Sequence, residues 1–160
     1  MADNDAVLAD AVSRERRGQL ELQQPPKRNL SGERLRRTQR LRSPRDFQRV
    51  RTQGKRVSRP LLTLGYVAQT PTEPGYRGYT RVGFSVGRRV GVAVARNRVK
   101  RRLREVMRRK WAEIVPGYDL VITARPGAAD ARMETLEQEV HALLARAQLL
   151  ITDTERGATI

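Results

Sequence analysis

The chain has 160 residues, of which 38% are hydrophobic and 31% charged, and it carries a formal net charge of +16 at pH 7. It contains no cysteine, which excludes a disulfide scaffold, a thiolate metal site and a cysteine nucleophile. No apolar run approaches the ~18 residues of a membrane span, and the acidic N-terminal stretch lacks the basic start of a secretory signal. We therefore expect a soluble cytoplasmic protein with one small domain and an attraction for polyanions.

The positive charge is concentrated in two blocks. Residues 31–60 carry a net charge of +9 and residues 91–120 carry +6, whereas residues 1–30 sum to zero and residues 121–160 to −2. A polyanionic partner would therefore contact these two blocks.

The chain begins with a polar extension followed by a short helix. Residues 1–38 mix acidic, basic and glutamine residues with a proline pair, and we expect them to be largely disordered. Residues 43–54 predict a helix, with Ser43 as N-cap, Pro44 in the first turn and Gly54 at the end.

Two strands are predicted next. Residues 61–68 have the residue types of a strand, and a loop rich in Gly and Pro follows. In residues 81–87 the apolar side chains alternate, which places Val82, Phe84 and Val86 on one face, towards the core. The opposite face is small and polar, which is typical of a surface that another group approaches.

The C-terminal part predicts one strand and one helix. Residues 118–125 resemble a buried strand, and residues 130–150 have apolar side chains at 3.6-residue spacing. Together with the basic helix described next, the predicted order is helix, strand, strand, helix, strand, helix. This order indicates an α+β fold, a small α/β sandwich over residues 39–151, with residues 152–160 as a flexible tail.

A strongly basic helix is predicted over residues 96–113, before a Pro-Gly pair. Nine of the sixteen residues in 95–110 are Arg or Lys. The apolar residues of this segment nevertheless fall on one stripe that can pack on a sheet: Val99, Leu103, Val106 and Met107.

The remaining sides of this helix are either a solvated surface or a site for phosphates. Solvated faces usually mix charges of both signs, but here only Glu105 is acidic. We expect Arg96 and Arg98 near the helix N-terminus, where backbone N–H groups also favour anions. Apart from Asn97 the helix lacks short polar residues that read DNA bases, so the pattern favours phosphate binding over base recognition.

The stretch RVGFSVGRRVGVAVARNRVKRRLREVMR, residues 81–108, closely resembles the signature of the bacterial ribonuclease P protein subunit. The flanking stretches RDFQRVRTQGKRVSRP and GYDLVITARPGAA resemble that family's first helix and last strand. The resemblance covers about residues 39–151. It implies a sandwich with a left-handed βαβ crossover, as in ribosomal proteins.

The resemblance also implies a function. The family's protein binds a catalytic RNA, and this RNA, with Mg²⁺ that no dedicated protein site holds, removes the 5′ leader of precursor tRNA. The implied partners are the catalytic RNA and the leader, in a ribonucleoprotein with one monomeric protein per RNA. Carried over to this chain, the residues that bind the catalytic RNA are Arg96, Asn97, Arg98, Lys100, Arg101 and Arg104. Those that line a leader cleft between the first helix and the sheet are Phe47, Arg51, Ser85 and Arg89.

Three positions depart from the family pattern. Val92 stands where the family usually has Asn, Arg51 where a second aromatic is frequent, and Gly65 where an aromatic is common on the first strand. The last two changes replace stacking with charge or open space in the leader cleft.

The acidic residues argue against a hydrolytic site in the protein itself. A metal-dependent nuclease needs clustered carboxylates, and the acids of the domain are dispersed, while those of the last helix (Glu134, Glu137 and Glu139) are expected on its solvated face. His141 is the only histidine, so an acid–base pair of histidines is excluded. We predict no catalytic residue in this chain. A structural RNA-binding protein of ribosomal type and a DNA-binding regulator are the alternatives.

Overall fold

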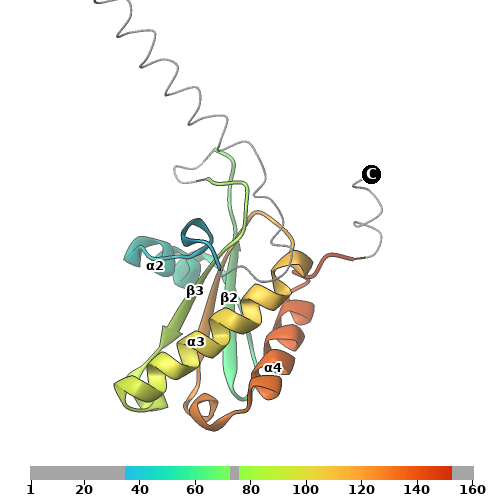
Figure 1. The fold of residues 1–160 in the computed structure, drawn as a ribbon. Helices are drawn as coiled ribbons and strands as arrows, with labels where there is room; N and C mark the ends of the chain where they lie inside the picture. The colour runs from blue at the N-terminus through green and yellow to red at the C-terminus, as the bar shows by residue number, and fades with distance from the viewer. Residues whose placement is uncertain (1–34, 73–75, 153–160) are drawn as a thin grey trace, which may run out of the picture.

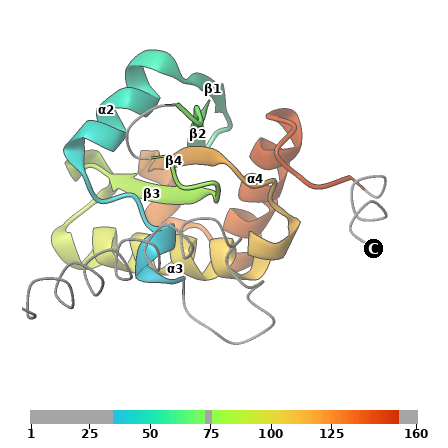
Figure 2. The same cartoon turned by 90° about the horizontal axis from the view of Figure 1, so that it is seen from above.

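The computed structural model describes residues 35–72 and 76–152. A four-stranded sheet forms its centre, with one helix on one face and two helices on the other (Figures 1 and 2). The strands are β1 (Lys55–Ser58), β2 (Leu62–Ala68), β3 (Arg81–Val86) and β4 (Tyr118–Ala124). The α-helices are α2 (Pro44–Gln53), α3 (Ala93–Lys110) and α4 (Met133–Arg146), and short 3-10 turns are η1 (Arg37–Gln39), η2 (Arg88–Val90), η3 (Trp111–Glu113) and η4 (Pro126–Asp130).

The strand order in the sheet is β1-β2-β4-β3. β1 pairs with β2 and β2 with β4 in antiparallel fashion, whereas β3 and β4 are parallel neighbours. Parallel neighbours require a crossover, and here α3 supplies it. The predicted α+β fold is confirmed, and this connection is the βαβ unit that the resemblance implied.

Strand β1 is absent from the predicted element order. Its residues pair with β2 from Lys55 opposite Tyr66 to Ser58 opposite Thr63. Only Val57 is partly buried, and the other three side chains are exposed. A short, polar edge strand lacks the apolar alternation on which strand prediction depends, so the pairing with β2 decides its structure.

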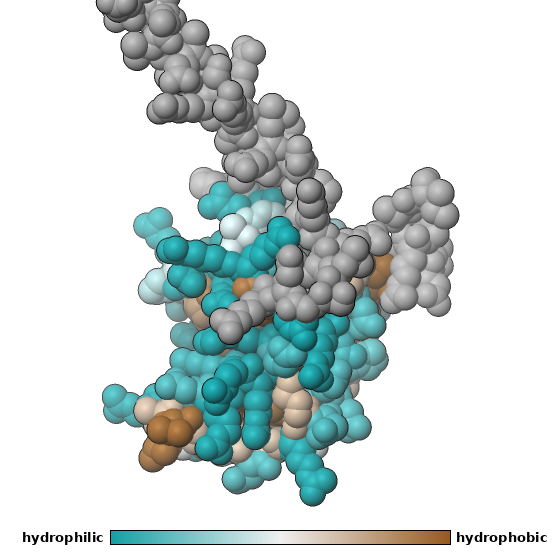
Figure 3. Space-filling model, in the orientation of Figure 1, coloured by the Kyte–Doolittle hydropathy of each residue, from teal (hydrophilic) through white to brown (hydrophobic). Residues whose placement is uncertain are grey.

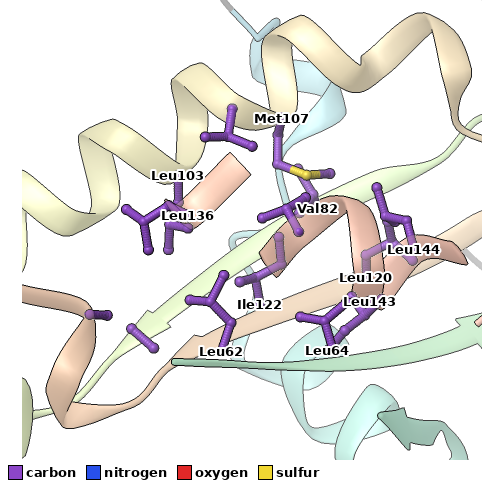
Figure 4. Packing of buried hydrophobic residues seen from close by; sticks show 14 of the residues in the cluster. Leu62, Leu64, Val82, Leu103, Met107, Leu120, Ile122, Leu136, Leu143 and Leu144 are labelled. Carbon is purple, nitrogen blue, oxygen red and sulfur yellow. The ribbon is translucent and has the colours of Figure 1, made fainter. Parts of the chain in front are cut away.

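The main core lies between the sheet and the helices α3 and α4. Figure 4 shows side chains of the sheet meeting those of the two helices in one layer. The sheet contributes Leu62, Leu64, Val82, Leu120 and Ile122, α3 contributes Leu103 and Met107, and α4 contributes Leu136, Leu143 and Leu144, all of them 0–1% exposed. The predicted apolar stripes of both helices are therefore confirmed.

Helix α2 covers the opposite face of the sheet through a smaller apolar cluster. Val50, Leu41 and Val121 are buried there, and Phe47 packs against them. The predicted N-cap is confirmed, because the backbone N–H of Arg45 donates to the Ser43 hydroxyl at 3.2 Å.

The basic helix begins earlier than predicted. α3 starts at Ala93 with Val92 as N-cap, and the Arg96 backbone N–H already donates to the Val92 carbonyl at 3.0 Å. Gly91, with φ at +153°, allows the chain to turn directly into the helix. Arg96 and Arg98 are thus the fourth and sixth residues of the helix, still near its N-terminus but three residues further in than the predicted start at residue 96 implies.

Leu35, the first described residue, is 4% exposed and belongs to the main core, although it precedes the predicted boundary at residue 39. Most of the predicted disordered extension (residues 1–38) and of the predicted flexible tail (residues 152–160) lies outside the described residues. Within the described residues no helix is long and apolar enough to cross a membrane.

Candidate nucleic-acid interface

Helix α3 is anchored along one stripe and exposes the rest of its surface. Val99, Leu103, Val106 and Met107 are each 0% exposed. Figure 3 shows hydrophilic side chains over the outward side of this helix. The stripe fixes the helix on the sheet, so its cations have a defined position relative to the strands.

The cations in residues 93–104, which we call the N-terminal part of α3, have no acidic partner among the described residues. Within residues 35–72 and 76–152, no hydrogen bond or ion pair engages the side chains of Arg96, Arg98, Lys100, Arg101 and Arg104. The Nε of Arg96 is shielded from solvent and also lacks a partner there. An anion brought to this surface therefore meets charges that no neighbouring acid has neutralised.

The last turn of α3 differs, because its three cations, Arg108, Arg109 and Lys110, are paired with acids. Arg108 Nη2 lies 2.6 Å from Glu105 Oε1, and Arg109 Nε lies 3.2 Å from the same oxygen. Lys110 Nζ lies 3.8 Å from Glu113. The hydrogen bond from Arg108, helped by Arg109, lowers the pKa of Glu105 to about 2, so this acid is ionised at neutral pH. Among the described residues, the positive charge of α3 that no acid pairs with thus lies in its N-terminal part, residues 93–104.

A cavity of about 230 Å³ lies between α2 and the sheet, and we call it the α2–sheet cavity. Three cations from α2 and β1 lie at its rim, namely Arg51, Lys55 and Arg56. Its other lining residues include Ser85, Thr63, Thr123 and Gly65. Cations above a floor of hydroxyl groups and small residues suit a phosphodiester chain, which needs positive charge and hydrogen-bond donors.

The four residues predicted for the leader cleft occupy three different places. Arg51 and Ser85 line the α2–sheet cavity. Phe47 lies beside it, where its ring packs so closely on β3 that a Cβ at Gly83 would be 2.5 Å from Phe47 Cζ. Arg89 is exposed on η2 and lines neither this cavity nor the next. Their role as leader contacts stays a prediction.

A second cavity, of about 190 Å³, lies at the outer edge of β3, the last strand of the sheet, and we call it the Phe47–Phe84 cavity. Its apolar lining consists of the two phenyl rings with Leu41 and Val82. Its cationic lining consists of Arg40, Arg42, Lys100 and Arg104. The sequence did not reveal this cavity, because α2, β3 and α3 contribute to it together with the segment before α2.

A buried acidic group fixes the side of the sheet next to α2. Asp119 of β4 is 1% exposed and accepts hydrogen bonds from Arg81 Nε at 3.0 Å, Arg81 Nη2 at 2.9 Å and Gln69 Nε2 at 2.8 Å. Arg49 of α2 lies 3.6 Å from the same carboxylate. Burial by itself lowers the pKa of Arg81, but the hydrogen bonds and charges of Asp119 and Asp46 outweigh it and raise that pKa. The sequence shows Asp119 only as a dispersed acid, whereas the fold makes it the link between β3, β4 and α2.

One acidic residue is not where the sequence placed it. Glu139 was expected on the solvated face of α4, but it is 6% exposed and bonds to Arg59 Nε at 3.0 Å and to the Leu61 backbone N–H at 3.3 Å. The predicted solvated position of Glu139 is wrong because β1 and the turn after it cover that side of α4. His141 is exposed and lies 3.4 Å from Lys110 Nζ. No three His, Asp or Glu side chains of the described residues come close enough to share a metal ion.

Comparison with known proteins gives one consistent result. Residues 35–148 match the family model described as Ribonuclease P. The chain is 43% identical over 115 residues to the ribonuclease P protein component of Herpetosiphon aurantiacus, covering 72% of this chain and 89% of the relative. It is 46% identical over 110 residues to that of Streptomyces avermitilis, covering 67% and 89%.

Solved structures agree with this result. The RNase P protein of Staphylococcus aureus matches with a TM-score of 0.62 and 25% identity, covering 71% of this chain and 98% of that one. The RNase P protein of Thermotoga maritima matches with a TM-score of 0.58 and 29% identity, covering 67% and 96%.

Proposed function

The chain belongs to the ribonuclease P protein family, and we propose that its two cationic surfaces, on α3 and at the α2–sheet cavity, bind different RNAs. The protein acts with an RNA subunit in removing the 5′ leader of precursor tRNA, and it is a component of this endoribonuclease. In our proposal the N-terminal part of α3, residues 93–104, binds the catalytic RNA, through Arg96, Asn97, Arg98, Lys100, Arg101 and Arg104. The α2–sheet cavity binds the leader, with Arg51 and Ser85 in its lining.

The observation that carries this proposal is the division of charge along α3. Cations that already pair with acids gain little from meeting phosphates, because the acid must first be displaced. The cations of the last turn, Arg108, Arg109 and Lys110, pair with Glu105, Glu113 and Glu137. Those of the N-terminal part, residues 93–104, have no acidic partner among the described residues, so RNA can bind there at the smallest cost.

The second part of the proposal concerns the chemistry. The RNA subunit carries out the hydrolysis with Mg²⁺, and the protein contributes no catalytic group. The scattered acids support this assignment: Asp119 is engaged by Arg81 and Gln69, and Glu105 by Arg108 and Arg109. Phosphate oxygens of the RNA would then hold the metal ions, since magnesium prefers oxygen ligands.

The net charge of +16 supports one protein monomer per RNA, because protein copies repel one another in the absence of a polyanion. We also propose that the protein acts in the cytoplasm, where precursor tRNA of bacteria is processed.

The deciding experiment is cleavage of a precursor tRNA by a bacterial ribonuclease P RNA at low Mg²⁺, with and without this protein. The expected result is faster cleavage at the mature 5′ end in the presence of the protein, with the protein inert when tested alone. Tight RNA binding without faster cleavage would instead indicate a structural RNA-binding protein. Cleavage by the protein alone would contradict the assignment of catalysis to the RNA.

A further inference from the structure

We propose that the Phe47–Phe84 cavity binds one unpaired nucleotide of RNA, with its base against the two phenyl rings and its phosphate at Lys100 and Arg104. This inference rests on the proposed function and adds a binding site to it. The cavity joins the two surfaces that the proposed function treats separately, because α2 and β3 also line the α2–sheet cavity, whereas Lys100 and Arg104 belong to α3.

The cavity is open because β3 is the last strand of the sheet. Figure 2 shows the segment leading into α2 passing this edge on its way from the side of α3 to the side of α2. The Leu41 backbone N–H donates to the Val82 carbonyl at 2.9 Å, which fixes that segment against the strand. This backbone hydrogen bond therefore holds the wall of the cavity that contains Leu41 against β3.

The two phenyl rings are held by different apolar clusters. Phe84 packs against the main core, and Phe47 packs against the cluster under α2. Both side chains are only half-buried, so each ring leaves part of its surface to the cavity. The absence of a side chain at Gly83 lets the Phe47 ring approach β3. A flat, apolar ligand can thus contact rings that are already in place, which lowers the entropic cost of binding.

Cations at the cavity can bind a phosphate without first breaking an ion pair with a described acid. Lys100 and Arg104 are four residues apart on α3, so their side chains lie on the same side of the helix. Neither makes a hydrogen bond or an ion pair with any residue that the structure describes, and the same holds for Arg42 at the rim. Among the described residues, no carboxylate lines the cavity, and all of its charged lining residues are cations.

Aromatic rings beside free cations match the parts of a nucleotide. Bases stack on aromatic side chains, and phosphates bind Lys and Arg. A volume of about 190 Å³ is below the ~300–1,000 Å³ of sites for drug-sized ligands, so the cavity suits a single base. Bases in a duplex are stacked on each other and cannot enter such a cavity. The nucleotide must therefore come from an unpaired segment, either of the leader or of the catalytic RNA.

The first test compares variants of the full-length protein in two binding assays, one with a precursor tRNA that carries its leader and one with the catalytic RNA alone. Phe84→Leu keeps an apolar side chain for the core but removes the ring, whereas Phe84→Tyr keeps the ring. We expect Phe84→Leu to weaken binding about fivefold or more in one of the two assays, and Phe84→Tyr to bind as the wild type does. The assay that responds identifies the source of the nucleotide.

A second pair of variants tests the phosphate without touching the core. Lys100→Gln should weaken binding of the same RNA by about five- to eightfold at 0.1 M salt, which is the loss expected when one phosphate contact is removed. Lys110→Gln is the matched control, because Lys110 lies on the same helix but next to Glu113. It should leave binding unchanged. Thermal unfolding of each variant must match the wild type for its binding result to count, and Lys100→Gln decides if Phe84→Leu unfolds.

The outcomes separate this inference from the proposed function. If the wild-type protein stimulates cleavage but folded Phe84→Leu binds both RNAs as the wild type does, the nucleotide site is refuted and the proposed function stands. Unchanged RNA binding by folded Lys100→Gln would refute the phosphate contact at the cavity and would also remove Lys100 from the proposed surface for the catalytic RNA. Equal losses for Phe84→Leu and Phe84→Tyr would refute the stacking of a base. Failure of the wild-type protein to stimulate cleavage would refute the proposed function itself.

Discussion

Replacing Arg98 and Arg101 by Gln should weaken RNA binding and make it less dependent on salt. Five cations in the N-terminal part of α3 have no partner among the described residues, namely Arg96, Arg98, Lys100, Arg101 and Arg104. Each phosphate contact contributes about 0.7–0.9 to the slope of log affinity against log salt. Five contacts therefore give a slope of about −3.5 to −4.5, and the double variant should reduce its magnitude by about 1.4–1.8.

The same arithmetic gives the loss of affinity. If the two contacts act through release of counterions, the double variant binds about 25- to 60-fold more weakly at 0.1 M salt than the wild type. The measurement is a series of binding titrations with a bacterial ribonuclease P RNA between 0.05 and 0.5 M monovalent salt, roughly the range in which this dependence is linear. Both side chains are exposed and lie off the buried stripe, so thermal unfolding should not change.

The control removes the same charge from the same helix. Arg108→Gln combined with Arg109→Gln also lowers the net charge by two, but these side chains pair with Glu105. We expect its slope to stay close to that of the wild type. If both double variants reduce the slope equally, binding depends only on net charge, and the argument from ion pairing along α3 is refuted.

Three further predictions concern stability. Leu103→Ala removes a side chain that is 0% exposed and should cost about 2–5 kcal/mol in denaturant unfolding. Gly83→Ala places a methyl group 2.5 Å from Phe47 Cζ and should cost about 1–3 kcal/mol, much of which Phe47→Ala should relieve in the double variant. The hydrogen bond from Arg108 lowers the pKa of Glu105 to about 2 in the folded protein. The ion pair therefore stabilises the fold fully at pH values above the unfolded-state pKa of about 4.3, and this stabilisation is lost as the pH falls to 2. Thermal unfolding of Glu105→Gln and the wild type should therefore differ at pH 6 and converge near pH 2; a difference independent of pH would contradict this.

Much of the fold could be predicted from periodicity along the chain. The spacing of Val99, Leu103, Val106 and Met107 predicted the buried face of α3, and the Ser43–Pro44 pair predicted the start of α2. These signals are local, because the residues that set them lie within one or two helical turns of one another. Strand β1 had no such signal, since its side chains are mostly exposed.

The candidate interface was predictable in its residue types but not in its charge balance. The sequence allows Glu105 to pair with Arg101, Arg102, Arg108 or Arg109, because all four are three or four residues away. The structure pairs it with the last two. Arg102 instead donates to the Ala131 carbonyl at 2.9 Å, which links α3 to the segment before α4.

The amino-acid sequence by itself determined the three helices and three of the four strands, which helix carries the excess positive charge and which of its faces is buried, because spacing along a helix or strand fixes these properties. Only the tertiary structure decided that Asp119 engages Arg81 and that Phe47 and Lys100 line one cavity. These partners are 38 and 53 residues apart in the numbering of the chain. Contacts at such separations depend on the order of strands in the sheet and on the crossover through α3, and no local pattern encodes them.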